Sequence, residues 1–314
     1  MSRTAPIRDE PMLAVVGPTA SGKTAAALAL ARMFGGELIG ADSVQVYRGF
    51  DIGSAKPTVE ELAGIAHHLI DVADADAPID AAQYAALADE AIAATIARGH
   101  VPIVVGGTGL WLRALLRGLV DLPPVDHALR AALEKEAMAL GLGALHARLR
   151  EVDPRAAKAI HANDRIRIIR ALEVHSQTGH ALGDLHHEHA LGAPRYNTLT
   201  FVLADDAELV TERIIARTDT MLAAGFEDEV RALLARWGPD VRALQSVGYR
   251  EMIARIQGNV SLDQTRTAII RSTRIYARRQ RTWWKNEPGV HAKLPAAALS
   301  AVAQLSEIRV HLRK

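Results

Sequence analysis

Residues 12–24 read MLAVVGPTASGKT, and this stretch decides the fold of the chain. Residues 12–16 are a short apolar run of the kind found in buried strands, and residues 23–34 form a helical run that ends at Gly35 and Gly36. The eight residues that follow the strand match the phosphate-loop pattern G-x-x-x-x-G-K-S/T at every position. They are Gly17, Pro18, Thr19, Ala20, Ser21, Gly22, Lys23 and Thr24.

The residue types of this loop suit it to phosphate groups. Its glycines let backbone N–H groups turn inward around phosphate oxygens, and the helix that begins near Gly22 adds the positive end of its dipole. Lys23 supplies a point charge, and Thr24 can hold Mg²⁺ directly or through water. The loop predicts a di- or triphosphate, or a diphosphate ester, as the ligand, and it leaves the reaction open.

The pattern around the loop predicts an α/β fold, with a P-loop NTPase-like parallel sheet core and an inserted helical domain. Residues 37–41 and 101–105 are further strand-like runs, and residues 80–98 are Ala-rich and helical. Strands that alternate with helices are typical of a parallel sheet covered by helices. We assign residues 1–120 and 199–314 to this core.

Residues 121–198 are predicted to be the helical insertion, because no convincing strand signal occurs between Asp121 and Tyr196. A strand signal returns at residues 201–203, and helices are expected from there to the end of the chain. The helices expected in the insertion are 126–140, 142–151, 154–161 and 164–178, and those expected after it are 206–224, 226–236, 246–257, 261–285 and 295–307.

The composition excludes several classes of protein. The 314 residues include no Cys, which rules out disulfides, thiolate zinc sites, iron–sulfur clusters and a cysteine nucleophile. The apolar runs are too short for a transmembrane helix, and residues 1–11 lack the apolar segment of a signal peptide. We therefore expect a cytoplasmic protein with no membrane contact, and we take a monomer as the default.

Polar side chains follow two of the expected strands. Asp42 and Ser43 come directly after residues 37–41, and Thr108 lies in the glycine-rich turn after residues 101–105. Ligands of open parallel sheets bind outside the carboxyl ends of the strands, so these side chains are expected near the phosphate loop. A carboxylate there could accept a proton while a phosphate group leaves. The alternatives are that Asp42 caps a turn and that the glycines around Thr108 serve tight packing.

Positive charge gathers towards the end of the chain. Residues 264–285 hold seven Lys or Arg and no Asp or Glu. The arginine stripe, which consists of Arg271, Arg274, Arg278, Arg281 and Lys285, follows steps of three and four along one helix face about 21 Å long. Like charges at these spacings destabilise a helix, so the stripe favours a polyanionic partner over the alternative of a solvated face.

Three weaker signals are given structural interpretations. Asp205 and Asp206 follow a strand signal as a Mg²⁺ ligand would, but capping of the next helix is the stronger interpretation. Residues 186–189 (HHEH) have metal-ligand spacing, but they are expected in a loop without further ligands. His67 and His68 are attributed to packing or to a turn.

Taken in order, the motifs resemble the tRNA dimethylallyltransferase family, also called tRNA isopentenyltransferases, in its bacterial form. The phosphate loop is shared with many families, whereas the full ordered set is highly specific and extends from about residue 12 to 285. The matching segments are GPTASGKT at 17–24, ADSVQVY at 41–47, DIGSAKP at 51–57, HHLID at 67–71, GGTGL at 106–110, NDRIRIIRALEV at 163–174, MLAAGFEDEV at 221–230, SVGYRE at 246–251 and ARRQRTW at 277–283.

The resemblance implies a reaction and its partners. Family members transfer a dimethylallyl group from dimethylallyl diphosphate to N6 of adenosine 37, next to the anticodon of tRNAs that read codons beginning with U. The resemblance implies that the phosphate loop holds the diphosphate of this donor, that Mg²⁺ assists, and that the acceptor is an anticodon stem-loop with adenosines at 36, 37 and 38. The acceptor base must leave its stack to reach such a site.

The resemblance also implies roles for residues. Asp42 is implied as the general base for N6, and Lys23, Arg217 and Thr108 are implied around the leaving diphosphate and the transferred group. The residues implied to lie against tRNA are Asp42, Ser43, Val44, Gln45, Thr108, Arg130, Ile166, Arg167, Ile168, Ile169, Arg170, Ser246, Val247, Gly248, Tyr249, Arg250, Glu251, Arg274, Arg278, Arg279, Gln280, Arg281, Thr282, Trp283 and Lys285.

Three alternative functions remain to be compared with this one. A P-loop small-molecule kinase would bind ATP tightly and needs no basic helix. A prenyltransferase acting on free adenine nucleotides would tolerate loss of the arginine stripe. A non-catalytic RNA-binding protein is disfavoured, because the phosphate loop and Asp42 are intact.

Replacing Arg274, Arg278 and Arg281 by Ala should weaken tRNA binding and flatten its salt dependence. Each phosphate contact that is lost removes roughly one unit from the slope of log K against log salt concentration. Filter binding of tRNA over a series of salt concentrations measures that slope. An unchanged slope would mean that the stripe faces solvent.

Overall fold

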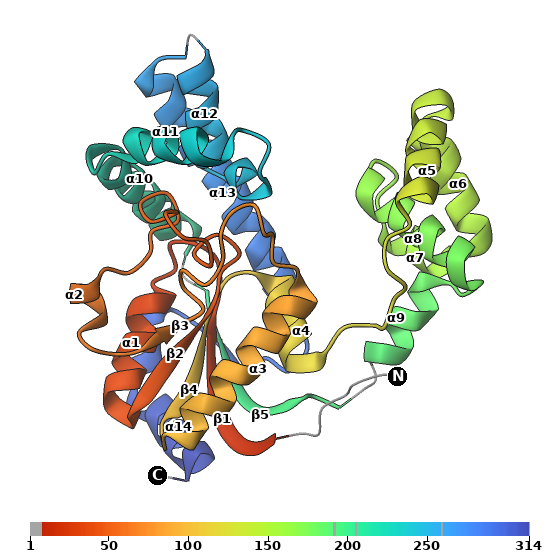
Figure 1. Cartoon of the computed structure of the whole chain (residues 1–314). Helices are drawn as coiled ribbons and strands as arrows, with labels where there is room; N and C mark the ends of the chain where they lie inside the picture. The colour runs from red at the N-terminus through yellow and green to blue at the C-terminus, as the bar shows by residue number, and fades with distance from the viewer. Residues whose placement is uncertain (1–7, 191–192, 205, 259, 314) are drawn as a thin grey trace. The chain divides into compact units, whose positions relative to one another are not determined.

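The structure is a computed structural model that describes residues 8–190, 193–204, 206–258 and 260–313. It divides into two units, which are considered separately. The smaller unit is Arg117–Pro194, and the larger unit comprises the described residues before and after it (Figure 1). Within the described ranges, no helix combines the length and the apolar character needed to cross a lipid bilayer.

A six-stranded parallel sheet forms the centre of the larger unit, in the order β3-β2-β4-β1-β5-β6 (Figure 1). The predicted α/β class is therefore correct. β1, the strand before the phosphate loop, lies between β4 and β5. The strands are β1 (Arg8–Val16), β2 (Gly36–Ala41), β3 (His67–His68), β4 (Val101–Gly106), β5 (Tyr196–Leu203) and β6 (Ala292–Leu294).

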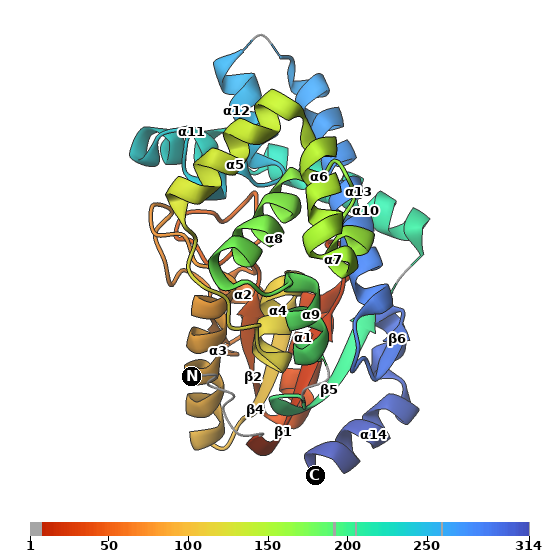
Figure 2. The ribbon, with the colours of Figure 1, turned by 90° about the vertical axis from the view of Figure 1, so that its right-hand side faces the viewer.

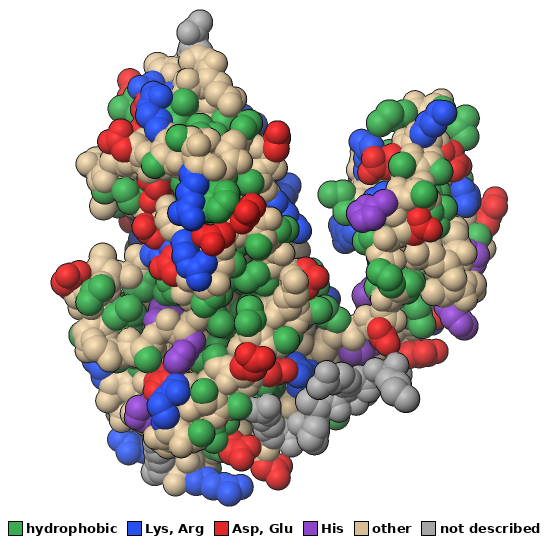
Figure 3. Space-filling model, viewed as in Figure 1, with side chains coloured by type: hydrophobic (Ala, Val, Ile, Leu, Met, Phe, Trp, Pro, Cys, Tyr) green, Lys and Arg blue, Asp and Glu red, His purple; other side chains and the backbone are tan. Residues whose placement is uncertain are grey.

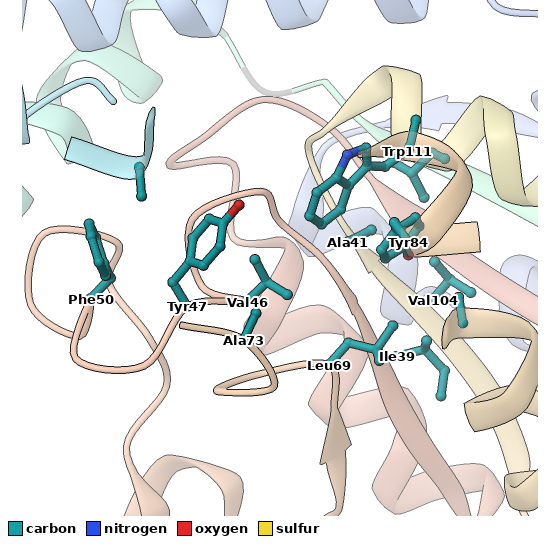
Figure 4. Close-up of a cluster of buried hydrophobic side chains, with 14 of the residues drawn as sticks. Ile39, Ala41, Val46, Tyr47, Phe50, Leu69, Ala73, Tyr84, Val104 and Trp111 are labelled. Carbon is teal, nitrogen blue, oxygen red and sulfur yellow. The ribbon is translucent and has the colours of Figure 1, made fainter. Parts of the chain in front are cut away.

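Helices cover both faces of this sheet, and alternate residues of β1 pack into two separate cores. Met12 belongs to the core shared with α3 and α4, whereas Leu13 belongs to the core shared with α1 and α14. Figure 4 shows part of the first core, where Tyr84 and Trp111 stack beside Val104. α14 lies beside β1 in both ribbon views (Figures 1 and 2). The covering helices are α1 (Lys23–Phe34), α3 (Ala81–Ala97), α4 (Gly109–Arg117) and α14 (Val302–Leu312).

Further helices of the larger unit gather beyond the carboxyl ends of the strands (Figure 1). They are α10 (Ala207–Ala223), α11 (Phe226–Trp237), α12 (Tyr249–Gln257) and α13 (Leu262–Asn286). The short helix α2 (Val59–Leu62) lies between β2 and β3 in the sequence. α10 and α13 pack along each other through Val210, Ile214 and Ala277. This arrangement brings the basic helix predicted from the sequence to the phosphate-loop end of the sheet.

The smaller unit consists of helices around an aliphatic core of its own, with Leu145, Leu149 and Ile168 fully buried. Asp126 and Asp164 cap the helices that follow them by accepting hydrogen bonds from backbone N–H groups. The unit begins and ends slightly before the predicted boundaries of 121 and 198. Its helices are α5 (His127–Leu140), α6 (Leu142–Val152), α7 (Pro154–Ala159), α8 (Arg165–Thr178) and α9 (Leu182–Ala190).

Four sequence expectations require correction. Residues 186–189 lie in helix α9 instead of a loop. Residues 246–248 are not helical, because Gly248 adopts a φ of +94° as the cap of α12. The expected helix 295–307 is divided at Ala301 into η2 (Ala296–Ser300) and α14. β6 was missed because three residues carry no strand periodicity, and it is stabilised only by pairing with β5.

The expected cap before α10 is confirmed in part. Asp206 accepts a hydrogen bond from the backbone N–H of Glu208 at 2.9 Å, so it serves the helix terminus as predicted. Asp205 lies outside the described residues. β5 begins at Tyr196, five residues before the strand signal at 201, because the polar residues Asn197, Thr198 and Thr200 interrupt the apolar pattern there.

A buried carboxylate fixes the edge of the sheet beside β3. Glu37, in β2, is 5% exposed and accepts hydrogen bonds from Arg98, Thr95, His68 and His100. The hydrogen bonds from Arg98 chiefly hold the pKa of Glu37 well below its usual value of 4.5, against the opposing effect of burial. His68 therefore has the structural role expected for it.

Glu37→Gln should lower the free energy of unfolding by about 3 to 5 kcal/mol at pH 7, since it leaves buried donors without a charged acceptor. A carboxylate with a lowered pKa stabilises the fold at every pH above its unfolded pKa and loses this effect as the pH falls below about 4.5. Urea denaturation at pH 7 and pH 4 should therefore show the difference from wild type shrinking at the lower pH. Glu212→Gln, at an exposed position, is the control. A difference that does not depend on pH would contradict this account.

Candidate active site

The phosphate loop has a positive φ at two glycines, and at Gly17 there is also no room for a side chain. Gly17 has a φ of +151°, and a Cβ there would lie 2.7 Å from the carbonyl oxygen of Leu203. Gly22 has a φ of +79° and is the N-cap residue of α1. Because glycine has no side chain, it does not bond to the first N–H groups of the helix. The first N–H groups of α1 are therefore left for a ligand, which is the requirement for binding an anion at a helix N-terminus.

A pocket of about 210 Å³ opens beside this loop at the carboxyl ends of the strands. It collects side chains from segments that are far apart in the sequence. Lys23 and Thr24 come from the start of α1, Asp42 follows β2, and Arg217 comes from α10. The structure thus brings together four of the residues predicted to take part in the reaction or in metal binding.

Two cationic side chains share this pocket. Lys23 Nζ donates to the carbonyl oxygen of Pro18 at 3.1 Å, and Arg217 Nη1 donates to Thr19 Oγ1 at 3.1 Å. Burial lowers the pKa of Lys23 from 10.5 to about 8, with Asp42 opposing the shift and Arg217 adding to it. Burial also lowers the pKa of Arg217. Two partly desolvated cations beside a helix N-terminus form a binding site for a polyanion.

Asp42 caps a turn and also lines the pocket. One carboxylate oxygen, Oδ1, accepts hydrogen bonds from the backbone N–H groups of Val44 at 2.9 Å and Gln45 at 3.3 Å, which is a turn cap. No described residue hydrogen-bonds to Oδ2. Asp42 also lines the pocket and interacts electrostatically with Lys23 and Arg217. The turn therefore holds the carboxylate in place and leaves one oxygen to accept a proton.

Thr108 is fixed next to Asp42 by the neighbouring strand end. Its hydroxyl accepts a hydrogen bond from the backbone N–H of Ser43 at 3.1 Å, and its own N–H donates to the carbonyl oxygen of Ala41 at 3.2 Å. The hydroxyl of Tyr276, in α13, lies close enough to the Thr108 side chain to interact with it. Burial, and then the charge of Asp42, raises the pKa of Tyr276, so this hydroxyl stays protonated.

The sequence analysis missed Tyr276. A signal existed in the helical spacing, because Tyr276, Gln280 and Trp283 follow steps of four and three on the side of α13 away from the arginine stripe. Gln280 is 7% exposed, accepts from the backbone N–H of Thr19 at 2.8 Å and donates to the carbonyl oxygen of Gly107 at 2.9 Å. This face of the helix therefore supports the phosphate loop.

His67 is another pocket residue that the sequence analysis did not assign to a site. Both of its ring nitrogens are buried, and neither has a hydrogen-bond partner in the part of the chain that the structure describes. Burial lowers the pKa of His67 to about 4, with the neighbouring His68 adding to the shift. The imidazole is therefore neutral at neutral pH.

The residues predicted to contact tRNA fall into buried and exposed groups. The side chains of Ile168, Ile169, Tyr249 and Gln280 are at most 7% exposed, so the predicted surface is corrected at these four positions. Burial has a physical reason in each case, because the two isoleucines form the core of the smaller unit and the other two support loops of the larger unit. Trp283 is half buried, with the guanidinium of Arg113 4.3 Å from the centre of its ring.

Three arginines of the smaller unit that were predicted to contact tRNA are paired with acidic side chains. Arg130 and Arg170 both pair with Glu173, which is fully buried, at 2.8 and 3.2 Å. Arg167 pairs with Asp164, the cap of its own helix. Ile166, by contrast, is 79% exposed. Acidic and basic side chains are intermixed on the face of each unit that Figure 3 shows (Figure 3).

The arginine stripe differs from these surfaces. Arg271, Arg274, Arg278 and Arg281 line a groove with Val210 and other residues of α10. None of the five stripe residues forms an ion pair with a described residue. The stripe thus places a row of cations without ion-pair partners among the described residues along 15 residues of one helix. Such a row suits the binding of an anionic polymer.

The fold and the pocket define a P-loop protein that binds a phosphorylated ligand beside a carboxylate. The chain belongs to the IPP transferase family, whose model matches residues 45–287. It is 50% identical over 280 residues to tRNA dimethylallyltransferase 1 of Pelobacter propionicus, which covers 89% of this chain and 91% of that protein. It is 48% identical to the tRNA dimethylallyltransferase of Anaeromyxobacter sp. strain K, over 93% of this chain and 96% of that protein.

Solved structures agree with this assignment. The tRNA isopentenylpyrophosphate transferase of Bacillus halodurans superposes with a TM-score of 0.69 at 36% identity, over 98% of this chain and 96% of that one. A eukaryotic dimethylallyltransferase acting on tRNA superposes with a TM-score of 0.79 at 26% identity, over 95% of this chain and 77% of that one. The resemblance predicted from the motifs is therefore confirmed.

Affinity for inorganic diphosphate should fall as the pH rises above about 8. The lowered pKa of Lys23 means that the ammonium loses its proton in this range, so binding weakens towards about tenfold per pH unit. In Lys23→Arg, the guanidinium stays charged, so that variant controls for ionisation of diphosphate itself. Calorimetric titrations between pH 7 and pH 10 measure the difference. The same alkaline fall in both proteins would contradict the role given to Lys23.

Proposed function

We propose that this protein transfers a dimethylallyl group from dimethylallyl diphosphate to N6 of adenosine 37 in tRNAs that read codons beginning with U. The observation that carries the proposal is that one pocket, in a member of the IPP transferase family, contains both a polyanion site and a carboxylate. The pocket therefore has a place for a leaving diphosphate and a base for the attacking amine.

The chemistry follows from these two parts. The bond between allylic C1 and the diphosphate oxygen breaks, and a bond forms between N6 and C1. The proton released from N6 passes to Asp42, and diphosphate leaves with the electron pair of the broken bond. The phosphate-loop N–H groups, Lys23 and Arg217 stabilise the charge that develops on the diphosphate. Thr108, beside Asp42, borders the acceptor side.

The pocket also fits Mg²⁺, which usually keeps several waters and takes its remaining ligands from substrate phosphates and one or two protein oxygens. Thr24 lines the same pocket as Lys23, and its hydroxyl is the oxygen that would hold the ion, directly or through water. When bound, Mg²⁺ would neutralise charge on the diphosphate.

We assign tRNA contact to the arginine stripe of the larger unit and to exposed residues of the smaller unit, which include Ile166 and Arg167. The stripe has the length of several phosphates along a nucleic-acid strand, and none of its cations pairs with an acidic side chain in the described part of the chain. The expected monomeric state and cytoplasmic location remain predictions.

One assay tests the proposal. The protein is mixed with Mg²⁺, radiolabelled dimethylallyl diphosphate and either an anticodon stem-loop with adenosines at 36, 37 and 38 or free AMP. Label should enter the stem-loop and not AMP. Label in AMP alone would indicate a prenyltransferase of free nucleotides, and label in neither would favour the kinase alternative.

Asp42→Asn should reduce turnover in this assay by about 100-fold or more, because the amide cannot accept the N6 proton. Binding of the stem-loop should be retained, since the amide oxygen can still cap the turn at Val44 and Gln45. Single-turnover kinetics with saturating substrates measure the chemical step. Turnover close to that of wild type would remove Asp42 from the role of general base.

A further inference from the structure

The loop at residues 51–55, between β2 and α2, has an unusual arrangement of backbone donors. Glu229, in α11, accepts hydrogen bonds from three consecutive N–H groups, those of Asp51 at 3.0 Å, Ile52 at 2.6 Å and Gly53 at 3.1 Å. The hydroxyl of Tyr249, at the start of α12, donates to Glu229 Oε1 at 2.8 Å. One carboxylate thus satisfies three successive backbone donors and a tyrosine hydroxyl.

Tight packing supports the same loop. A Cβ on Gly53 would lie 2.3 Å from the ring of Phe226 and 2.5 Å from that of Tyr249, so only glycine fits between these rings. Phe50, at the start of the loop, is fully buried, and its ring centre lies 4.9 Å from that of Tyr249. Figure 4 shows Phe50 and Tyr47 at this end of the core (Figure 4). The loop is therefore held by α11 and α12 instead of by the sheet.

The far end of the loop reaches the pocket. The side chains or backbone of Ser54 and Ala55 line it together with Asp42 and Gln45. The carbonyl oxygens of Ser54 and Ala55 accept hydrogen bonds from Gln45 Nε2 at 3.0 and 3.1 Å. Both hydrogens of that amide nitrogen are therefore used, and no described residue hydrogen-bonds to Gln45 Oε1.

These bonds fix the direction of the Gln45 amide. An amide nitrogen donates two hydrogen bonds, whereas an amide oxygen only accepts. Because the two loop carbonyls require donors, they bind the Gln45 nitrogen and leave its oxygen without a partner among the described residues. The group left for a substrate is an acceptor oxygen, three residues after Asp42. An acceptor oxygen at that position suits a base that presents N–H groups, such as the exocyclic amine of adenine.

We infer that Glu229 is a positioning residue for the acceptor side of this pocket, and that it acts by holding loop 51–55 so that Gln45 presents its amide oxygen. The inference rests on the proposed function for the identity of the acceptor. It gives a role to Glu229, which belongs to the segment at residues 221–230. Glu229 does not line the pocket, so it cannot touch a reacting atom there.

The variant Glu229→Gln tests this inference, because its amide keeps an accepting oxygen but turns an N–H group towards the backbone donors. Glu227→Gln is the matched control, since Glu227 lies on the same helix, changes the same charge and pairs only with Arg231 and Arg255. Both variants are assayed with labelled dimethylallyl diphosphate and the stem-loop, and donor affinity is measured separately without acceptor.

Glu229→Gln should raise KM for the stem-loop or lower kcat, with a total loss in kcat/KM of about 10-fold to 100-fold, the scale expected when a group is misplaced by about 1 Å. Donor affinity should change by less than about twofold, since Gln280 and Arg217 hold the phosphate loop independently. Wild-type kinetics in Glu229→Gln would overturn the inference. Inactivity of wild type and Glu227→Gln would instead reject the proposed function.

A double-mutant cycle separates positioning from general stability. In a Gln45→Ala background, Glu229→Gln should cost little further activity, because the two residues act through the same loop. An equal cost in both backgrounds would overturn the inference, since Glu229 would then act elsewhere. If Glu229→Gln does not fold, Tyr249→Phe removes one donor to Glu229 with little change in volume and should produce a smaller loss of the same kind.

Discussion

The phosphate loop can bind an anion only if the first N–H groups of α1 remain without partners inside the protein, and the rest of the larger unit is arranged around that requirement. Unpaired N–H groups are costly in a folded chain, so the loop has to be supported from outside its own backbone. Support comes from a close approach at Gly17, from the left-handed Gly22 and from Gln280, whose amide connects Thr19 to Gly107. Residues 12–16 of β1, directly before the loop, are fully buried, which gives this support a rigid base.

Helix α13 connects the phosphate loop to the arginine stripe, which is the surface of the larger unit proposed to bind tRNA. One side of the helix carries Tyr276, Gln280 and Trp283, which contact the strand-end loops and the phosphate loop. Another side carries the arginine stripe, whose cations have no acidic partners among the described residues. A single rigid helix therefore fixes the register between the pocket and the surface proposed for tRNA. In the smaller unit, Arg130 and Arg170 instead pair with Glu173, and Arg167 pairs with Asp164. These ion pairs neutralise part of the positive charge of that unit.

Much of the fold was predictable because its signals are local. A strand, a glycine turn and a helix are contiguous at residues 12–34, and helix α1 begins and ends as its glycines indicate. Longer helices such as α3 and α8 have the necessary periodicity and caps. β3 and β6 were missed because strands of two or three residues exist through pairing with β2 and β5, not through their own sequence. The break at Gly248 depends on a positive φ that helix periodicity does not reveal.

From the sequence alone we predicted a phosphate-binding loop, a core built on a parallel sheet, and one site containing Lys23, Asp42 and Thr108; the parallel sheet is confirmed. These predictions were possible because motif chemistry and the rule for strand ends depend only on residues that are near in sequence. The tertiary structure decided which side chains actually meet. Arg217 is 198 positions from Thr19, Gln280 is 261 positions from it, and Glu229 is about as far from loop 51–55. These contacts depend on how the helices pack over the strand ends, so no periodic pattern in the sequence predicts them.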